Sequence, residues 1–529
     1  MPAAGGTIGQ AAEGDNSWPE QAAWAHAAPD GAAVRRRVGR AFRELMRFVE
    51  GASGTRGYEA FEGKLIIRVF GLARLLIVLF LTLSEERTEV SASFRRGRCQ
   101  YRRQPAKGRW LGTFFGKVRY WRTYAHQTNG RGGGFYPLDD ELGLSADGFS
   151  FGLLGRSVLL ATKMSFASAA MTLKSFLGWA PSTKTIEQAT LGLGRHTAAW
   201  FEKAPPPEDD GEVLIVQVDS KATPTATEAE LNKRRGERTP NPHPESARHR
   251  GRASRKRRGS KKRRKKGDKS KNGKATTLVT MYTLKRTTDD EGQTKLLGPF
   301  NRWTYGSYAP KRHAIAIARR EANKRGFAPD SGKTVQVLTD GDEDLERYVG
   351  EMFPEAIHTP DVIHCIEYVW KAGGCLYKEG SAQLARWVEE RKTELYEGQV
   401  WQMLEAMNEA SSRIRSKKKR ERYGKYLDYL IKRADRMNYA DLAAQDLELS
   451  TGMIEGAVRY VVSQRFDEGG MRWIRERAEA LLQLRCIQIN GDWERFMAFA
   501  HHRIQDGPQR RHRVLRADPA PLPTFNLAA

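Results

Sequence analysis

Cysteine is scarce in this sequence. The 529 residues include only Cys99, Cys365, Cys375 and Cys486, and no two of them form a Cys-x-x-Cys pair. This spacing excludes a framework of disulfides and a zinc knuckle built from paired cysteines. It favours a protein that works in the reducing cytoplasm.

Long uncharged apolar runs are also missing. The most apolar window, 65–83, contains Arg68 and Arg74, and its longest uncharged run, 75–84, has 10 residues. A membrane-spanning helix needs about 20 apolar residues, so we expect a buried helix here and no membrane partner. The first 30 residues are rich in Ala, Gly and Pro and lack the basic and apolar segments of a signal peptide, which predicts a disordered tail over 1–30.

Positive charge is in excess. Lysine and arginine total 89 against 63 acidic residues, which gives a net charge of +26 and a pI of about 9.9. Such a balance points to a polyanionic partner, and nucleic acid is the leading choice. With this partner we expect the protein to be associated with the nucleoid.

The charge is densest between residues 233 and 274. This segment holds 20 lysines and arginines and three acidic residues, a net charge of +17, and nothing in it can form a core. We expect a disordered loop over 228–275 that binds DNA or RNA phosphates without sequence preference. A solvated loop without a partner is the alternative. The phosphate-binding residues expected at its centre are Lys261, Lys262, Arg263 and Arg264.

Three acids stand in settings that suit catalysis. Residues 213–218 are almost all apolar and run directly into Asp219, which predicts a buried central strand that delivers this acid to the edge of a sheet. Asp340 closes a similar apolar run at 334–339, and Glu455 follows later in the chain. Three such carboxylates can hold two divalent cations, Mg²⁺ or Mn²⁺, and align a nucleophile for phosphoryl transfer. Taken singly, each strand-end Asp is also explained as a turn former.

Two of these acids have rivals. Asp342 competes with Asp340, but Asp340 directly follows the apolar run, so the strand itself aims it, whereas Asp342 lies beyond Gly341. Glu494 is a weaker rival of Glu455.

The order of elements between 211 and 370 suggests a fold. Strands are expected at 213–220, 276–284, 295–305, 334–339 and 356–361, with helices at 309–324 and 344–352. The ribonuclease H-like fold has this order, and its first and fourth strands, which here end in Asp219 and Asp340, are neighbours. We therefore expect an α/β core with a mixed five-stranded sheet flanked by helices. An all-helical insertion over 371–449, a core completion over 450–500 that carries the third acid, and a tail over 501–529 follow.

The segment 31–203 predicts a mostly helical, DNA-binding module. Helical patterns cover 33–83, with a break at 51–57, and 150–177, while 113–124 predicts a hairpin or two short strands. Ser182 or Thr183 can cap a further helix after a short turn. A helix-turn-helix and an ordinary helical hairpin both remain open.

Several motifs together resemble one family. The chain is similar to bacterial insertion-sequence transposases with a DDE catalytic core, most of all to the Kra type, over residues 136–496. The order and spacing of the motifs are more specific than any one of them. They are Val218-Asp219-Ser220-Lys221-Ala222, Thr339-Asp340-Gly341-Asp342, Asp361-Val362-Ile363-His364, Gly452-Met453-Ile454-Glu455-Gly456, Gly470-Met471-Arg472-Trp473, Ala478-Glu479-Ala480-Leu481-Leu482 and Asn490-Gly491-Asp492-Trp493-Glu494.

The resemblance implies DNA transposition: two-metal-ion cleavage at the ends of a mobile element, then strand transfer into target DNA. By position, Asp219, Asp340 and Glu455 would be the catalytic metal ligands. Asp361 and His364 match a D-x-x-H motif beside the core of related groups, and they would be auxiliary, although a structural His is equally compatible. Related transposases pair double-stranded DNA ends as homo-oligomers, and an RNA partner stays open. Some relatives carry paired cysteines before the Pro-Leu-Asp stretch, and none are found here, so no zinc is expected.

Two basic residues follow Glu455 along the chain. Arg459 lies one helical turn beyond it and Arg465 ten residues beyond, so both could neutralise DNA phosphates; an exposed helix face without a partner would look the same. Two other classes of function remain open. One is a metal-dependent nuclease with the same core and no strand transfer, and the other is a non-catalytic nucleic-acid-binding protein.

Overall fold

The computed structural model describes residues 27–54, 57–88, 91–129, 133–226, 273–288, 290, 292–467, 471–507 and 512–524. The chain divides into two compact units. The first unit consists of Met1–Leu193 and Glu494–Asp518, and the second unit consists of Gly194–Trp493 and Pro519–Ala529. The expected disordered segments at 1–30 and 228–275 lie largely outside the described residues.

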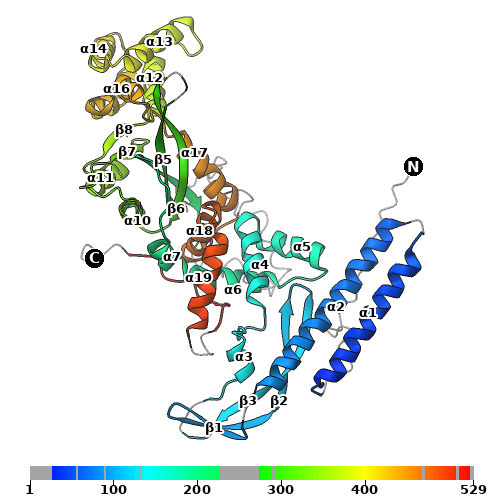
Figure 1. The fold of residues 1–529 in the computed structure, drawn as a ribbon. Coiled ribbons are helices and arrows are strands. Elements are labelled where there is room, and N and C mark those ends of the chain that lie inside the picture. The colour runs from blue at the N-terminus through cyan, green and yellow to red at the C-terminus, as the bar shows by residue number, and fades with distance from the viewer. Residues whose placement is uncertain are drawn as a thin grey trace, which may run out of the picture. The chain divides into compact units, whose positions relative to one another are not determined.

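The second unit is built on a mixed five-stranded sheet (Figure 1). Its strand order is β6-β5-β4-β7-β8; β4 pairs antiparallel with β5 and parallel with β7, β5 and β6 are antiparallel, and β7 and β8 are parallel. The expectation of an α/β core with a mixed five-stranded sheet is confirmed. The strands are β4 (Val213–Pro224), β5 (Gly273–Thr288), β6 (Thr294–Ser307), β7 (Thr334–Thr339) and β8 (Ile357–Pro360).

The central strand β4 is apolar on both faces because both faces are covered. Ile215 lies in one hydrophobic cluster with residues of the helices that follow β8. Helix η3 contacts β4 as well, and α18 contacts the neighbouring part of the sheet at β6. A strand buried on both sides reads as a continuous apolar run rather than an alternating one. The helices around the sheet are α7 (Thr197–Lys203), α10 (Lys311–Lys324), α11 (Glu343–Met352), α12 (Val362–Leu376), α17 (Gly452–Ala457), the π-helix η3 (Val458–Asp467) and α18 (Arg475–Ile489).

The insertion after α12 is helical, as the sequence indicates. It contains α13 (Ala382–Tyr396), α14 (Val400–Ser411), α15 (Lys417–Ile431), the short 3-10 helix η2 (Ala434–Arg436) and α16 (Tyr439–Ala444). Its apolar side chains, such as Met407 and Leu430, join those of α12 and the sheet in a single cluster. The insertion is therefore an extension of the core of the second unit and not a separate folding unit.

The first unit is less helical than expected. A three-stranded antiparallel sheet, β1-β2-β3, stands beside its helices, and the hairpin expected near Gly116 joins the long strands β2 and β3. Within this unit Asp139 is buried and is held by Arg109 and by the Tyr120 hydroxyl at 2.7 Å. The elements are α1 (Gly31–Ala52), α2 (Tyr58–Arg87), β1 (Ser93–Arg96), β2 (Cys99–Thr113), β3 (Gly116–Gln127), α3 (Pro137–Glu141), α4 (Phe151–Lys163), α5 (Phe166–Leu177), α6 (Thr183–Gly194) and α19 (Trp493–Gln505).

The helix expected to be buried, α2, is buried on one side only. Leu75, Val78 and Leu81 are inaccessible, whereas Ile67 and Phe80 are more than half exposed. Among the described residues, α2 is the one helix that is both long enough and apolar enough to cross a bilayer. Of its most apolar window, 28% is buried. Its length alone does not distinguish a core helix from a membrane helix.

The boundaries of the units differ from the expected ones in two places. Helix α7, expected in the N-terminal module, contacts α10 and α18 and lies in the second unit. Residues 494–518, expected to be core completion and tail, lie in the first unit, where Val514 packs against Gly192. The helix-turn-helix interpretation of α5 and α6 stays a prediction; Ser182 does cap α6, by accepting from the Thr185 amide at 3.1 Å.

Candidate metal centre

Two of the expected acids lie at the same level of neighbouring parallel strands, because Val218 of β4 is in register with Thr339 of β7. Asp340 follows the end of β7, as expected, whereas Asp219 lies within β4, which continues to Pro224 and does not end at the acid. The negative charge of Asp340 acts on the carboxyl of Asp219, which shows that the two are close. Residues 121 positions apart in the sequence are thus brought together by a single strand pairing.

The turn after Asp340 is fixed by the insertion. Gly341 has a φ of +90°, and a Cβ on it would lie 2.2 Å from the Tyr429 hydroxyl oxygen. Tyr429 of α15 donates a hydrogen bond to the main-chain oxygen of Asp340 at 3.1 Å, and Arg433 donates to the main-chain oxygen of Gly341 at 2.9 Å. Arg433 is 2% exposed and is itself held by both carboxylate oxygens of Glu346. The insertion therefore holds the backbone that carries Asp340.

A second pair of polar side chains lies where β8 passes into α12. Asp361 caps α12 by accepting from the Ile363 amide at 3.0 Å, and its other oxygen accepts from Nδ1 of His364 at 2.8 Å and from the Thr451 hydroxyl at 2.6 Å. The main-chain amide of Asp361 donates to Thr339 at 3.0 Å, one residue before Asp340. Because Asp361 occupies Nδ1, Nε2 is the nitrogen of His364 left for a metal ion or a phosphate oxygen.

The third acid, Glu455, reaches this place from α17. Its carboxylate, the carboxylate of Asp361 and a ring nitrogen of His364 lie within 4.8 Å of one another. Helix α17 is docked on the sheet by Gln217, a fully buried residue of β4 that accepts from the Ile454 amide at 2.9 Å and donates to the main-chain oxygen of Ser450 at 3.2 Å. One strand thus presents Asp219 and positions the helix of Glu455.

Charge interactions link the members of the cluster. Burial, followed by the neighbouring charge of Asp340, raises the pKa of Asp219 to about 6. The hydrogen bond to Asp361 raises the pKa of His364, and the Asp340 charge acts in the same direction. Burial opposes ionisation of Asp361, yet hydrogen bonds from His364 and Thr451 hold its pKa below the usual range.

The donor atoms suit a divalent cation. Asp361, His364 and Glu455 could hold a metal ion. Asp219 and Asp340 are not part of this group, but their charges and that of His364 act on one another, so the two carboxylates lie near it. Among these residues Asp361 is the least suited to be a ligand, because it is 1% exposed and its oxygens already accept hydrogen bonds from its neighbours. We interpret Asp361 as the group that orients His364. No thiolate takes part, since the cysteines of α12, Cys365 and Cys375, are buried in the hydrophobic cluster.

Several expected site residues lie elsewhere or have other partners. Asp342 caps α11 and pairs with Lys311 at 2.5 Å, so it helps to hold the turn instead of competing with Asp340. Arg465 is 2% exposed and stacks over the ring of Trp473, and burial lowers its pKa to about 10. The expected phosphate contact of Arg465 does not fit this structure, because the side chain is buried; Arg459 is exposed, as such a contact requires.

The remaining expected residues fall outside the site or outside the description. Glu494 lies in the first unit and pairs with Arg156 at 2.6 Å. Lys261, Lys262, Arg263 and Arg264 lie outside the described residues.

Four residues that position the site were not predicted from the sequence: Gln217, Gln336, Tyr429 and Arg433. Gln336 of β7 is fully buried and bonds to both the main-chain amide and the oxygen of Glu448, at 3.0 and 2.7 Å. A glutamine in the middle of an apolar strand was the available signal, since buried polar groups are rare unless they have partners. Tyr429 and Arg433 gave no such signal within an ordinary amphipathic helix.

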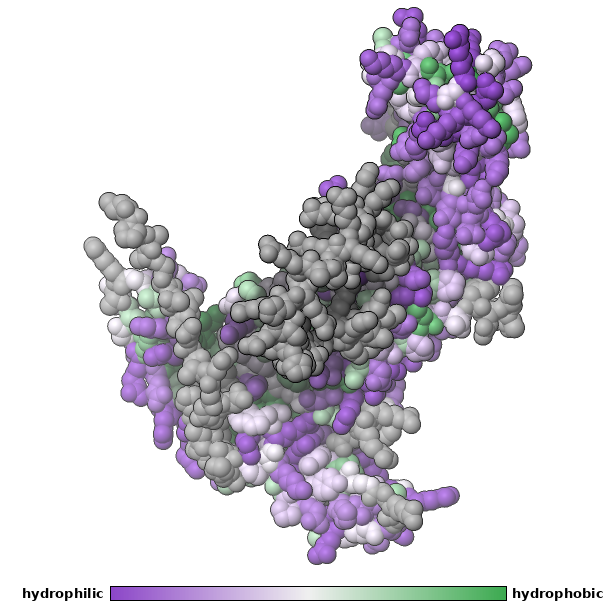
Figure 2. All heavy atoms as spheres, turned by 180° about the vertical axis from the view of Figure 1, so that it is seen from behind, coloured by the Kyte–Doolittle hydropathy of each residue, from purple (hydrophilic) through white to green (hydrophobic). Residues whose placement is uncertain are grey.

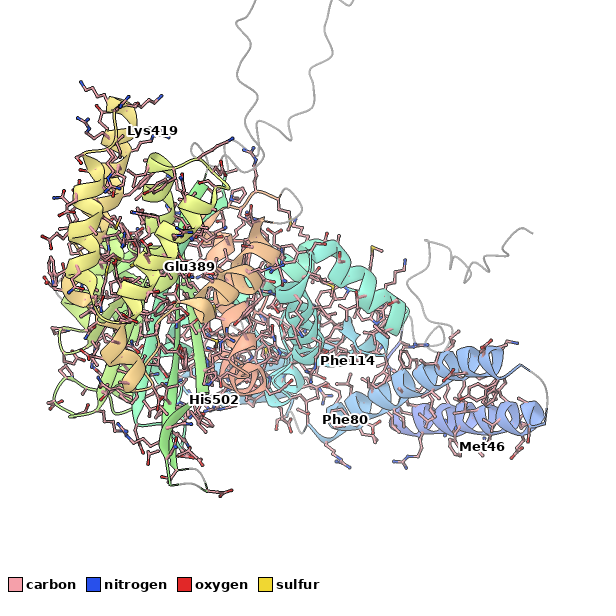
Figure 3. All side chains as sticks on the ribbon, turned by 90° about the horizontal axis from the view of Figure 1, so that it is seen from above. Met46, Phe80, Phe114, Glu389, Lys419 and His502 are labelled. Atoms are coloured by element: carbon pink, nitrogen blue, oxygen red, sulfur yellow. The ribbon has the colours of Figure 1, made fainter. Side chains whose placement is uncertain are left out.

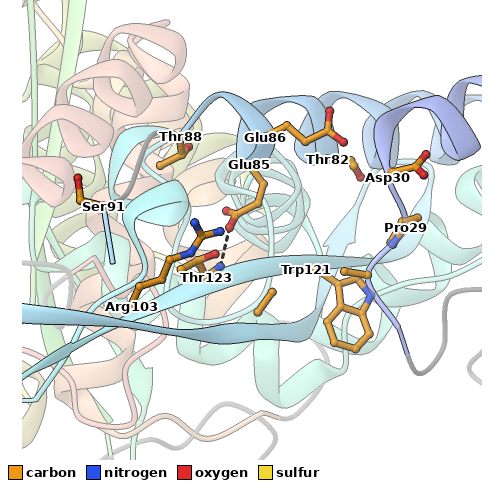
Figure 4. A pocket seen from close by; sticks show the side chains of 12 residues that line it. Pro29, Asp30, Thr82, Glu85, Glu86, Thr88, Ser91, Arg103, Trp121 and Thr123 are labelled. Carbon is orange, nitrogen blue, oxygen red and sulfur yellow. Dashed lines mark hydrogen bonds between the residues drawn. The ribbon is translucent and has the colours of Figure 1, made fainter. Parts of the chain in front are cut away.

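A cavity of about 620 Å³ lies in the first unit, beside the C-terminal end of α2 (Figure 4). Its acids hold protein elements: Glu85 accepts from the Thr123 amide at 2.7 Å, Glu86 accepts from the Gly31 amide at 2.6 Å, and Asp30 caps α1. These contacts explain the acids without a ligand.

Comparisons with known proteins add no assignment. No protein-family model matches the chain, and no curated protein matches it. The resemblance to insertion-sequence transposases thus depends on the motifs of the sequence alone.

Proposed function

We propose that the chain is a DNA transposase whose second unit is a ribonuclease H-like catalytic core. The observation that carries this proposal is the register of β4 and β7, which places Asp219 beside Asp340, with Glu455 and His364 completing a polar cluster. The strand order of the sheet and the helical insertion before α17 support it. The net charge of +26 supports a nucleic acid as the substrate.

The chemistry follows from the ligand atoms. A pair of Mg²⁺ or Mn²⁺ ions, when bound, would activate the attacking water or hydroxyl and stabilise the leaving oxygen. Asp219, Asp340 and Glu455 would hold these ions with hard oxygen ligands. His364 would place Nε2 toward a phosphate oxygen or a metal ion, and Asp361 would keep its ring in position. Arg459, on the exposed side of η3, would contact a neighbouring phosphate.

Two successive phosphoryl transfers make up the activity. In the first, water attacks a phosphorus at the end of the mobile element, and the bond to the 3′ oxygen breaks, which leaves a free 3′-hydroxyl. In the second, this hydroxyl attacks a phosphorus of the target DNA and releases another 3′-hydroxyl. Pairing of two element ends implies self-association of the protein, with an RNA partner left open.

The test uses the purified full-length protein. It is incubated with the genomic DNA that flanks its own coding sequence and with Mg²⁺ or Mn²⁺, and the nicks are mapped; oligonucleotides with pre-cleaved ends then report joining. We expect nicks at defined positions, joining of the 3′ ends, and loss of both in Asp219→Ala, Asp340→Ala and Glu455→Ala, with DNA binding retained. Nicking without joining would instead identify a nuclease, and metal-independent binding alone a non-catalytic binding protein.

A further inference from the structure

An exposed cluster of basic residues occupies the tip of the helical insertion. Residues 413–422 contain seven cations and a single acid, Glu421, and every one of the seven is exposed. We call this set, Arg413, Arg415, Lys417, Lys418, Lys419, Arg420 and Arg422, the basic tip. Figure 3 shows Lys419 at the end of α15, where the side chains point outward, and Figure 2 shows hydrophilic residues gathered over the insertion.

The basic tip is unfavourable for the helix that carries it. Lys417, Lys418 and Lys419 form the first turn of α15, where the helix dipole is positive, and no acid lies in that turn. Ser416 makes no capping hydrogen bond with its side chain. Among the described residues, no ion pair involves the basic tip, and only Arg420 of the set donates hydrogen bonds, to a main-chain oxygen. A charge pattern that opposes the local fold in this way is expected at a functional site.

The backbone under the basic tip is well held. Arg420 donates to the main-chain oxygen of Ile414 at 2.7 Å, and the Tyr423 hydroxyl donates to the main-chain oxygen of Met407 at 2.5 Å. Ile414 and Tyr423 are buried in the hydrophobic cluster of the second unit. The cations are therefore presented from a fixed surface.

The same helix leads back to the candidate metal centre. Lys418 and Tyr429 are 11 residues apart, a distance of about 16 Å along an α-helix. Tyr429 contacts the Asp340 turn. Duplex DNA rises about 3.4 Å per base pair, so on a duplex that runs along α15 a phosphate about five base pairs from one held at the carboxylates would lie near the basic tip.

We propose that the basic tip is a docking surface for the sugar-phosphate backbone of duplex DNA. The binding itself requires only the exposed cations, whereas the spacing of about five base pairs from the cleaved bond rests on the proposed function. Contacts of this kind are independent of sequence and depend strongly on salt.

The experiment compares two triple variants of the full-length protein. One replaces Lys417, Lys418 and Lys419 by Gln, and the control replaces Lys371, Lys378 and Arg386, three exposed cations of the same region outside the basic tip. Binding of a labelled 30-base-pair duplex is measured in EDTA over a range of salt concentrations. The basic loop at 228–275 is present in every variant, so its contribution is common to all.

We expect the tip variant to bind the duplex about tenfold more weakly and to lower the slope of log K against log salt by about 2 to 3, as the loss of three phosphate contacts requires. The control should change both by little, and neither variant should lower Tm. Equal effects of the two variants on duplex binding would overturn the proposal. Binding to anionic lipid vesicles is measured in parallel, and a tip variant that loses vesicle binding but keeps duplex binding would overturn it as well.

The outcome is separable from that of the proposed function. Because binding is measured in EDTA, the basic tip can be supported even where Asp219→Ala leaves cleavage intact. Conversely, metal-dependent cleavage with an unaffected tip variant would leave the function standing and reject the surface. Where nicks are mapped, hydroxyl-radical protection about five base pairs away should be lost in the tip variant.

Discussion

The hydroxyl of Tyr429 donates a hydrogen bond to the main-chain oxygen of Asp340, 89 residues earlier in the chain. The ring of Tyr429 also stacks on Tyr368 of α12, with centroids 3.6 Å apart, and Arg433 lies over it at 3.9 Å. Because Asp361 caps α12, one aromatic side chain of the insertion contacts two of the elements that deliver polar groups to the centre, the turn of Asp340 and the helix of Asp361 and His364. The insertion thus positions the candidate site.

Removing this hydroxyl tests the positioning role. Tyr429→Phe keeps the stacked ring and loses one hydrogen bond, a change of about 1 kcal/mol in stability. We expect metal affinity, measured by Mn²⁺-dependent stabilisation or calorimetry, to fall about threefold to tenfold because the Asp340 turn is released. Tyr426→Phe on the same helix is the control and should leave metal affinity unchanged. Equal metal affinities of the two variants would show that Tyr429 only fills space.

Gly341 offers a sharper perturbation of the same turn. Its φ of +90° is strained for any side chain, and a Cβ would collide with the Tyr429 hydroxyl at 2.2 Å. We expect Gly341→Ala to lower the free energy of unfolding by about 1 to 3 kcal/mol and to weaken metal binding. Gly350→Ala in α11, where nothing lies within 4 Å of the new Cβ, should be neutral or stabilising. A Gly341→Ala protein with the stability of the control would contradict the strain at this turn.

The sequence predicts the five-stranded sheet, and Asp219 and Asp340 on neighbouring strands, because both depend on local patterns. Each apolar run that ends in Asp219 or Asp340 has the length and composition of a buried strand, and the order of elements limits which strands can be neighbours. The inward turn of Arg465 was not predictable in this way, because the burial of a side chain depends on the residues that pack around it, here Trp473. The same holds for Tyr429, whose role depends on a contact between residues far apart in the chain. In the first unit the hairpin around Gly116 was expected, whereas β1 and the start of β2, which are basic and lack an apolar alternation, were not.

The raised pKa of Asp219 gives a prediction about pH. In the folded protein this pKa is about 6, above the usual 3.8, so folding favours the protonated form. The stability it contributes is present below about pH 4 and is lost as the pH rises through 6. A shift of about two units corresponds to about 3 kcal/mol at most, and partial exposure reduces our expectation to about 1 to 2 kcal/mol.

An asparagine at position 219 does not ionise, so Asp219→Asn avoids the fall in stability that ionisation of the carboxyl causes. In EDTA the variant should therefore be more stable than the unmodified protein at pH 8 and equally stable at pH 4. Thermal unfolding at the two pH values measures the difference, and Asp428→Asn on the exposed side of α15 is the control. Saturating Mg²⁺ at pH 8 should reverse the order, since only the protein with Asp219 gains from the ion. A variant that is less stable at pH 8 in EDTA would contradict the burial of charge at this position.

Gln217 gives the last prediction, because it joins strand and helix at the centre of the site. Its amide accepts from Ile454 and donates to Ser450, and these bonds dock the helix of Glu455 on β4. Gln217→Met has nearly the same shape but loses the hydrogen bonds to the Ile454 amide, the Ser450 oxygen and the Tyr282 hydroxyl, although the Ile454 amide keeps its bond to the Thr451 oxygen. The loss should lower the free energy of unfolding by about 2 to 3 kcal/mol. Val218→Ala, on the other face of the strand, should cost a similar amount through the cavity it creates. If Gln217 positions α17, its variant loses metal affinity by about tenfold while Val218→Ala retains it, although both unfold at similar denaturant concentrations. Equal metal affinities in two equally destabilised variants would mean that Gln217 contributes to the core and not to the placement of Glu455.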